Sequence, residues 1–233
     1  MRTELLLGAE KLEKIRRTKV LMFGVGGVGS WCAEALVRSG ICNLTMVDFD
    51  KVCASNCNRQ LMATSRTIDQ PKVHALRERL LEINPDANIV SIQGQYNSDT
   101  ADSFHLEEYD FIIDAIDSVA DKADLILRVT ALPKSVTLIS SMGAALRTDP
   151  FKVRRTEFWN IKGDPLARAL RHRFKKIQEF PKRKFQCIYS EETPMENMGE
   201  NTENERVNGS LCHITAIFGM SIAGTVINAI GPK

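Results

Sequence analysis

Short apolar runs alternate with segments whose apolar residues recur at helical spacing. The runs at 19–23, 43–47, 88–93, 109–116 and 136–140 predict strands, and the first is followed by a helical pattern over 28–39. The almost continuous apolar run around residues 111–113 is typical of a strand covered on both faces. Strands that alternate with helices favour right-handed crossovers. The sequence therefore predicts an α/β fold with a doubly wound, mainly parallel sheet.

Two further helices are marked by their ends or by their composition. Asp69, as a capping carboxylate, and Pro71, in the first turn, predict a helix start, and apolar residues at 73, 76, 80 and 83 form its stripe. The 20 residues of Leu211–Ile230 carry no formal charge and are long enough to span a bilayer. Polar residues and glycines interrupt them, so we expect a buried helix, in the interior of a layered domain or at a subunit interface, and no membrane span.

Charge is distributed unevenly along the chain. The 233 residues carry a net charge of +2, but residues 147–184 hold 13 Lys plus Arg against 4 Asp plus Glu. We expect one domain, with a nucleotide-binding half at 1–146 and a second segment at 147–233. Asp164–Pro165 predicts a helix start, after which Arg168, Arg171 and Lys175 fall within about 60° of one another. This basic face suits nucleic-acid phosphates or simply solvent.

The acidic segment Glu191–Arg206 holds six Glu and one Arg and has no periodicity, so it predicts an irregular loop of unassigned role. The start of the chain has no secretory pattern, which predicts a cytoplasmic location. Six cysteines without a C-x-x-C pair argue against a structural zinc site. We expect reduced, mostly buried thiols, with Cys187 and Cys212 packed as small apolar residues.

A glycine-rich turn follows the first predicted strand and opens the first long helix. It reads Gly24-Val25-Gly26-Gly27-Val28-Gly29. Glycines allow a phosphate to approach backbone amides, and a helix N-terminus favours its charge. In this context the motif predicts a Rossmann-like nucleotide site, and a tight turn without a ligand is the alternative.

A block of polar residues follows the second predicted strand. It contains two carboxylates, three amides and an arginine within 13 residues, which exceeds what a nicotinamide ribose needs. Arg59 and Lys72 can neutralise phosphate oxygens, and Asp117, at the end of a later strand, can hold Mg²⁺. These residues suit a nucleoside triphosphate, and the candidate binding residues besides these three and the four glycines are Asp48, Asp50, Ser55, Asn56 and Ser118.

Four motifs together resemble the ThiF/MoeB/HesA branch of ubiquitin-activating-enzyme-like adenylating enzymes. They are the glycine turn, the D-x-D-x-V-x-x-S-N-x-N-R-Q block, the Q-P-K motif and the D-A-I-D motif. The resemblance covers nearly the whole chain. It implies that Asp48, Ser55, Asn56, Arg59, Lys72 and Asp117 bind ATP and its metal. It also implies a homodimer in which Arg2 reaches the phosphates of the partner subunit.

Other stretches are similar to the tRNA-modifying members of this family, which adenylate the carboxylate of threonylcarbamoyladenosine and close it to a ring. They are residues 2–8, 114–118, 163–166 and 187–191. This likeness implies tRNA as a partner and permits a cysteine desulfurase or sulfur-acceptor partner. The alternatives are adenylation of a ubiquitin-like sulfur carrier, a nicotinamide oxidoreductase, and a scaffold that binds ATP without turnover.

Overall fold

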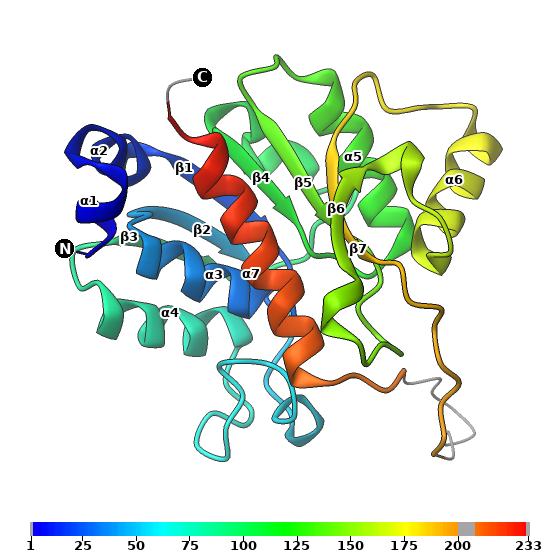
Figure 1. Cartoon of the computed structure of the whole chain (residues 1–233), viewed down its shortest axis with the longest axis horizontal. Helices are drawn as coiled ribbons and strands as arrows, with labels where there is room; N and C mark the ends of the chain where they lie inside the picture. Colours follow the sequence, from blue (N-terminus) through cyan, green and yellow to red (C-terminus); the bar gives the residue numbers. More distant parts are fainter. Residues whose placement is uncertain (1, 200–207, 232–233) are drawn as a thin grey trace.

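The computed structural model describes residues 2–199 and 208–231. Its centre is a seven-stranded sheet in the order β3-β2-β1-β4-β5-β7-β6, in which all neighbours are parallel except β6 and β7 (Figure 1). This confirms the predicted α/β class. The strands are β1 (Lys19–Phe23), β2 (Asn43–Val47), β3 (Asn88–Ile92), β4 (Phe111–Asp114), β5 (Thr137–Ser141), β6 (Val153–Glu157) and β7 (Gln186–Ser190).

Apolar side chains from alternate strand positions enter two separate cores, one on each face of the sheet. On β1, Val20 and Met22 enter one core, whereas Leu21 and Phe23 enter the other. The first core contains α2 (Ala9–Arg17), α3 (Gly29–Ser39), α4 (Lys72–Ile83) and α7 (Cys212–Ala229), and the second contains α5 (Val119–Ala131) and α6 (Pro165–Ile177). A first helix, α1 (Arg2–Leu7), precedes α2 at the edge of the molecule (Figure 1). Because helices cover both faces of the sheet, side chains on both sides of each central strand are buried, which explains why these strands are almost continuously apolar in sequence.

The structure confirms most predicted elements and corrects one helix start. Strands β1 and β2 have the predicted bounds, and Asp164 caps α6 by accepting a hydrogen bond from the Ala167 amide at 2.8 Å. The predicted cap of α4 is wrong. Asp69 lies two residues outside the N-cap residue Pro71, in a left-handed conformation with φ of 68°, and α4 has no side-chain cap. A carboxylate there belongs to a turn rather than to the helix.

Helix α7 lies across the sheet against α3, as Figure 1 shows. By length and composition it is apolar enough to cross a membrane. One side of the helix, including Ile214, Phe218, Ile222 and Val226, is fully buried in the first core. The prediction of a buried helix is confirmed for this side, whereas Met220 on the other side is 44% exposed.

We expect Gly219→Ala to lower the free energy of unfolding by about 3 kcal/mol, because overpacking against backbone is costly. A Cβ atom at Gly219 would lie 2.5 Å from the Val28 carbonyl oxygen, which precedes α3 and cannot move independently. Gly224→Ala on the same helix is the matched control, since a Cβ there meets no atom of the described residues within 4 Å. Urea denaturation of both variants is the measurement, and equal stabilities would contradict the expectation.

Candidate active site

The glycine turn connects the carboxyl end of β1 to α3. Gly24 has a φ of +86°, and a Cβ there would lie 2.6 Å from the Ala115 carbonyl oxygen. At Gly29 a Cβ would lie 1.9 Å from the Gly24 carbonyl oxygen. Both positions therefore require glycine for the backbone to bend so tightly.

A cavity of about 840 Å³ opens beside this turn, at the carboxyl ends of β1, β2, β4 and β5. Its volume lies near the upper end of the range for small-molecule sites, about 300–1,000 Å³. The carboxyl edge of an open parallel sheet is where ligands of such folds bind. Of the predicted site residues, those that line this cavity are Gly24, Gly26, Gly27, Asp48, Asp50, Asn56, Arg59, Lys72, Asp117 and Ser118.

Asp48 ties the glycine turn to the end of β2. One carboxylate oxygen accepts from the Val25 amide at 2.8 Å, and the other accepts from the Asp50 amide at 2.9 Å. Burial raises the pKa of Asp48, although the two amide bonds and the charge of Lys72 act against it. Each carboxylate oxygen keeps a lone pair that a ribose hydroxyl can use.

Lys72 lies under the cavity at the start of α4. Its ammonium is 2.6 Å from the Asp50 carboxylate, and its side chain is only 7% exposed. Its amide also donates to the Asp50 carbonyl at 3.0 Å. This places a positive charge, held in one orientation by Asp50, against the wall of the site.

Arg59 lies on the segment that follows β2 and includes a short 3₁₀ turn, Ala54–Asn56. Its guanidinium donates to the Ser55 carbonyl and to the Asn58 side chain, both at 2.9 Å. Asn56 is buried and accepts from the Cys53 amide, so it stabilises the turn. Ser55 is exposed and bonds to the Cys53 thiol at 3.1 Å, and it is not part of the cavity wall.

Asp117 and Ser118 are carried by the loop between β4 and α5, and a buried network supports that loop. Asp114 accepts from the Lys122 ammonium at 2.9 Å, the Ser140 hydroxyl at 2.6 Å and the Ile116 amide at 3.1 Å. Lys122 also donates to the Ile116 carbonyl, and both charged side chains have no exposed surface. The sequence analysis did not identify Lys122. The available signal was a lysine within the predominantly apolar helix α5.

The site offers few protein ligands for a metal ion. Within the described residues there is no group of three or more His, Cys, Asp or Glu side chains that could hold one. Mg²⁺ bound to a nucleotide takes one or two carboxylates and draws its other ligands from phosphate and water. The exposed Asp117 carboxylate on the cavity wall fits that requirement.

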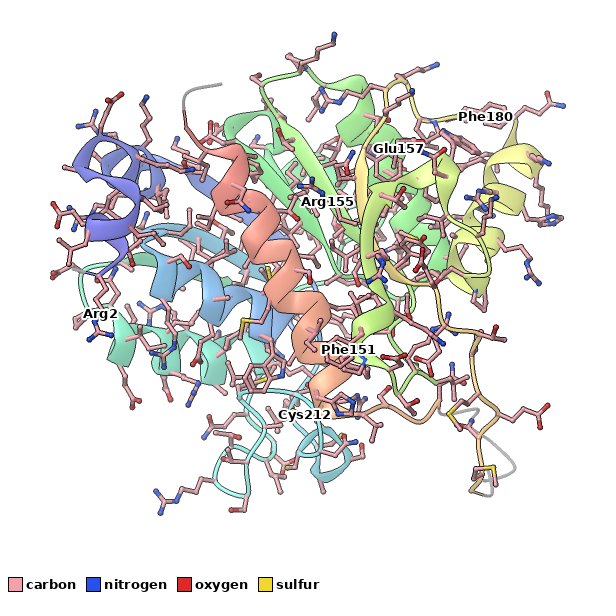
Figure 2. The ribbon with its side chains drawn as sticks, viewed as in Figure 1. Arg2, Phe151, Arg155, Glu157, Phe180 and Cys212 are labelled. Atoms are coloured by element: carbon pink, nitrogen blue, oxygen red, sulfur yellow. The ribbon has the colours of Figure 1, made fainter. Side chains whose placement is uncertain are left out.

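The predicted basic residues differ in their surroundings. Arg168 and Lys175 are exposed on α6, but Arg171 is half-buried and donates to the carbonyls of Phe158 and Ile161, both at 2.8 Å. Arg171 therefore holds the chain before α6 in place as well as carrying charge. Arg2 lies on α1 at the edge of the molecule and does not line the cavity of its own chain (Figure 2).

The expectation that the thiols are mostly buried is wrong. Cys187 is fully buried, as predicted, but Cys212 is exposed at the start of α7 (Figure 2), where the first turn projects beyond the core. Cys53 and Cys57 are exposed as well, because the segment after β2 lies over the cavity edge and not in a core. All six cysteines are free.

Cys53 is expected to react with iodoacetamide several-fold faster than Cys57 or Cys212 near neutral pH. A hydrogen bond from the Ser55 hydroxyl lowers the pKa of Cys53, so more of its thiol is ionised, and the thiolate is the nucleophile. Peptide mapping by mass spectrometry over a pH series measures the three rates. In Ser55→Ala the rate at Cys53 should fall; equal rates at all three thiols in the parent protein would refute the expectation.

The acidic segment begins as a cover for the cavity. Glu192 accepts hydrogen bonds from the amides of Thr148 and Asp149 at 3.0 Å, and Pro194 lines the cavity. On the other side, the Asn58 side chain donates to the Ser210 carbonyl at 3.0 Å. Residues 191–199 are irregular, as predicted, and the rest of the predicted loop, from 200 to 206, lies outside the described residues.

Comparison with known proteins agrees with this geometry. The model of the ThiF family matches residues 1–233. The chain belongs to the ThiF family. A tRNA threonylcarbamoyladenosine dehydratase of Bacillus subtilis is 39% identical over 83% of this chain and 75% of that protein. One of Haemophilus influenzae is 34% identical over 96% of this chain and 90% of its own length.

A solved relative also shares the ThiF fold along almost its whole length. The Escherichia coli tRNA threonylcarbamoyladenosine dehydratase in complex with ATP superimposes with a TM-score of 0.87 at 31% identity, covering 98% of this chain and 92% of that one. The molybdopterin-synthase adenylyltransferase of Escherichia coli is 33% identical over 70% of this chain and 62% of that protein.

Proposed function

We propose that this ThiF-family chain is an ATP-dependent enzyme that adenylates the carboxylate of threonylcarbamoyladenosine in tRNA and closes it to the cyclic form. One observation carries the proposal. The cavity brings the glycine turn, Arg59, Lys72 and Asp117 together from four separate segments. The relative solved with ATP is named as a tRNA threonylcarbamoyladenosine dehydratase. No sulfur chemistry is required.

The first step joins the substrate acid to AMP. A carboxylate oxygen attacks the α-phosphorus of ATP, and pyrophosphate leaves with the electrons of the broken bond. Arg59 and Lys72 offset the charge that accumulates on the phosphates, and the glycine turn places backbone amides beside them. Asp117 would hold Mg²⁺, which supplies further charge neutralisation when it is bound.

The second step needs no further reagent. An atom of the carbamoyl group attacks the acyl carbon, the acyl carbon–oxygen bond of the mixed anhydride breaks, AMP leaves with its electron pair, and one proton is lost. The ring therefore forms within one molecule, which makes alignment the main contribution of the protein. Pro194 and Ser210, which line the cavity, would limit access of water to the acyl-adenylate.

The tRNA would lie against the basic segment 147–184, with Arg168 and Lys175 on the exposed side of α6. We further propose a cytoplasmic homodimer in which Arg2 contacts the phosphates bound by the partner subunit. The family resemblance also permits a cysteine desulfurase or sulfur acceptor as an additional partner. Arg171 contributes to this surface less than its sequence position suggests, because its Nη2 group donates to carbonyls within the fold.

Nucleoside analysis tests the function directly. The protein is incubated with ATP, magnesium and tRNA that carries threonylcarbamoyladenosine, and the digested nucleosides are analysed by mass spectrometry. The expected product has lost one water, and AMP and pyrophosphate appear in equal amounts. Unchanged nucleoside with no AMP formed would overturn the proposal.

A second candidate function is adenylation of the C-terminal glycine of a ubiquitin-like sulfur carrier. The likeness to molybdopterin-synthase adenylyltransferase favours it. The two candidates separate in an ATP–pyrophosphate exchange assay. Exchange stimulated by a carrier protein but not by modified tRNA would favour the second candidate.

A further inference from the structure

The cavity extends well beyond the residues that account for a nucleotide. Arg59 and Lys72 follow β2, whereas another part of the wall follows β5 and includes Gly143 and Arg147. β1 and β4 lie between β2 and β5, so the two strands are about 14 Å apart at a strand spacing of about 4.8 Å. The wall after β5 is therefore a second region, adjacent to the β4 end that carries Asp117.

Arg147 is the charged group of this second region. It is only 2% exposed, and among the described residues its Nε and Nη1 atoms have no hydrogen-bond partner. Its Nη2 atom is 3.7 Å from the Asp164 carboxylate, which is beyond hydrogen-bond distance. Burial lowers the pKa of Arg147, but a guanidinium remains charged. A buried charge with this few partners is costly to the fold.

Neither nearby carboxylate satisfies this arginine. Asp164 uses one oxygen to cap α6 at Ala167, and its other oxygen also has no hydrogen-bond partner among the described residues. Glu192 accepts from the amides of Thr148 and Asp149 at Oε2 and from the Thr148 hydroxyl at Oε1. The helix cap and the loop contacts therefore hold two acidic groups near Arg147, and among the described residues neither accepts a hydrogen bond from it.

A carboxylate ligand would complete this arrangement. The guanidinium presents several N–H donors in one plane, which suits a carboxylate better than any single-point acceptor. Resting on the proposed function, we propose that Arg147 binds the carboxylate of the threonylcarbamoyl group and thereby positions the acid beside the α-phosphate. The Asp164 carboxylate lies 3.7 Å from the guanidinium, and its negative charge opposes a second carboxylate at the same position.

The test compares two forms of tRNA. One carries threonylcarbamoyladenosine, and the other carries the same nucleoside with its carboxylate converted to a carboxamide. Dissociation constants are measured with a non-hydrolysable ATP analogue present. The parent protein is expected to prefer the acid roughly ten- to a hundredfold, the range for a charge-assisted hydrogen bond. In Arg147→Gln this preference should disappear while affinity for the ATP analogue is retained.

A matched control separates recognition from folding. Arg79 also pairs with a buried carboxylate, that of Glu34 at 2.6 Å, but it lies on α4 outside the cavity wall. Arg79→Gln should lower stability and leave the acid preference unchanged. If Arg147→Gln does not fold, Asp164→Asn serves instead, because asparagine still caps α6 and removes the competing charge. The acid preference should then increase.

The outcomes distinguish this inference from the proposed function. If the parent protein cyclises the nucleoside but binds acid and carboxamide tRNA equally, Arg147 does not recognise the carboxylate. An acid preference that persists in Arg147→Gln, or that stays unchanged in Asp164→Asn, overturns the inference as well. Weakened binding of the ATP analogue in Arg147→Gln would place the residue in the nucleotide site. Absence of any cyclised product from the parent protein would instead refute the proposed function.

Discussion

Lys72→Ala is expected to reduce tRNA-stimulated ATP–pyrophosphate exchange about 100- to 1,000-fold, as the loss of one preorganised charge-stabilising donor does in other enzymes. The substitution removes a cation from the cavity wall and leaves the Asp50 carboxylate, 2.6 Å from the former ammonium, without its partner. That carboxylate would then repel the triphosphate. Both effects act on the same step, so the loss of exchange should exceed the loss of ATP affinity.

Two variants complete this experiment. Lys51→Ala removes an exposed lysine from the same segment, away from the cavity wall, and exchange should stay at the parental rate. Lys72→Ala combined with Asp50→Asn should recover part of the activity, because the repulsive charge is removed. Exchange by Lys72→Ala at the rate of the parent protein would show that the lysine has no part in adenylation.

Lys122→Met should lower the free energy of unfolding by about 3–5 kcal/mol, the cost of leaving one member of a buried ion pair alone. Lys122 and Asp114 have no exposed side-chain surface, and the ammonium donates to both the Asp114 carboxylate and the Ile116 carbonyl. Methionine has a similar volume, so the effect reports the uncompensated charge and not a cavity. Because Ile116 precedes Asp117, exchange activity should decrease as well.

Urea denaturation measures this effect against two references. Adding Asp114→Asn to Lys122→Met should recover much of the stability, since no buried charge then remains unpaired. Lys14→Met, which breaks an exposed pair with Glu10 at 2.8 Å, should change the stability by about 0–1 kcal/mol. If Lys122→Met were no more destabilising than Lys14→Met, the buried network would not support the site as described.

The fold was largely predictable because its signals are local. The bounds of β1 and β2 follow from short apolar runs that end at a glycine turn and at Asp48. The start of α6 follows from an N-cap aspartate and a proline at the next position. The cap of α4 was not predictable in the same way, since Asp69 adopts a turn conformation that depends on the pairing of Lys51 with Pro71.

The candidate site was predictable only in part. Motif spacing identified the glycine turn, Arg59, Lys72 and Asp117, and the structure brings all of them to one cavity. The burial of the cysteines could not be predicted from composition. Cys212, for example, is exposed because the first turn of α7 lies outside the core. The position of Arg171 on its helix likewise predicted a side chain facing solvent. Arg171 instead donates to the carbonyls of Phe158 and Ile161, which lie 13 and 10 residues earlier in the chain.

By itself the sequence determined the alternation of strands and helices, the tight turn that only glycine allows, and the presence of chemical groups that suit a triphosphate. These properties depend on residues close together in the chain. Only the tertiary structure decided that Asp50 orients Lys72 and that Lys122 supports the loop of Asp117. It also decided that Arg147 lies buried beside Asp164, where its Nε and Nη1 atoms have no hydrogen-bond partner among the described residues. Such pairings join separate elements, and the strand order and packing of the sheet set the distances between them.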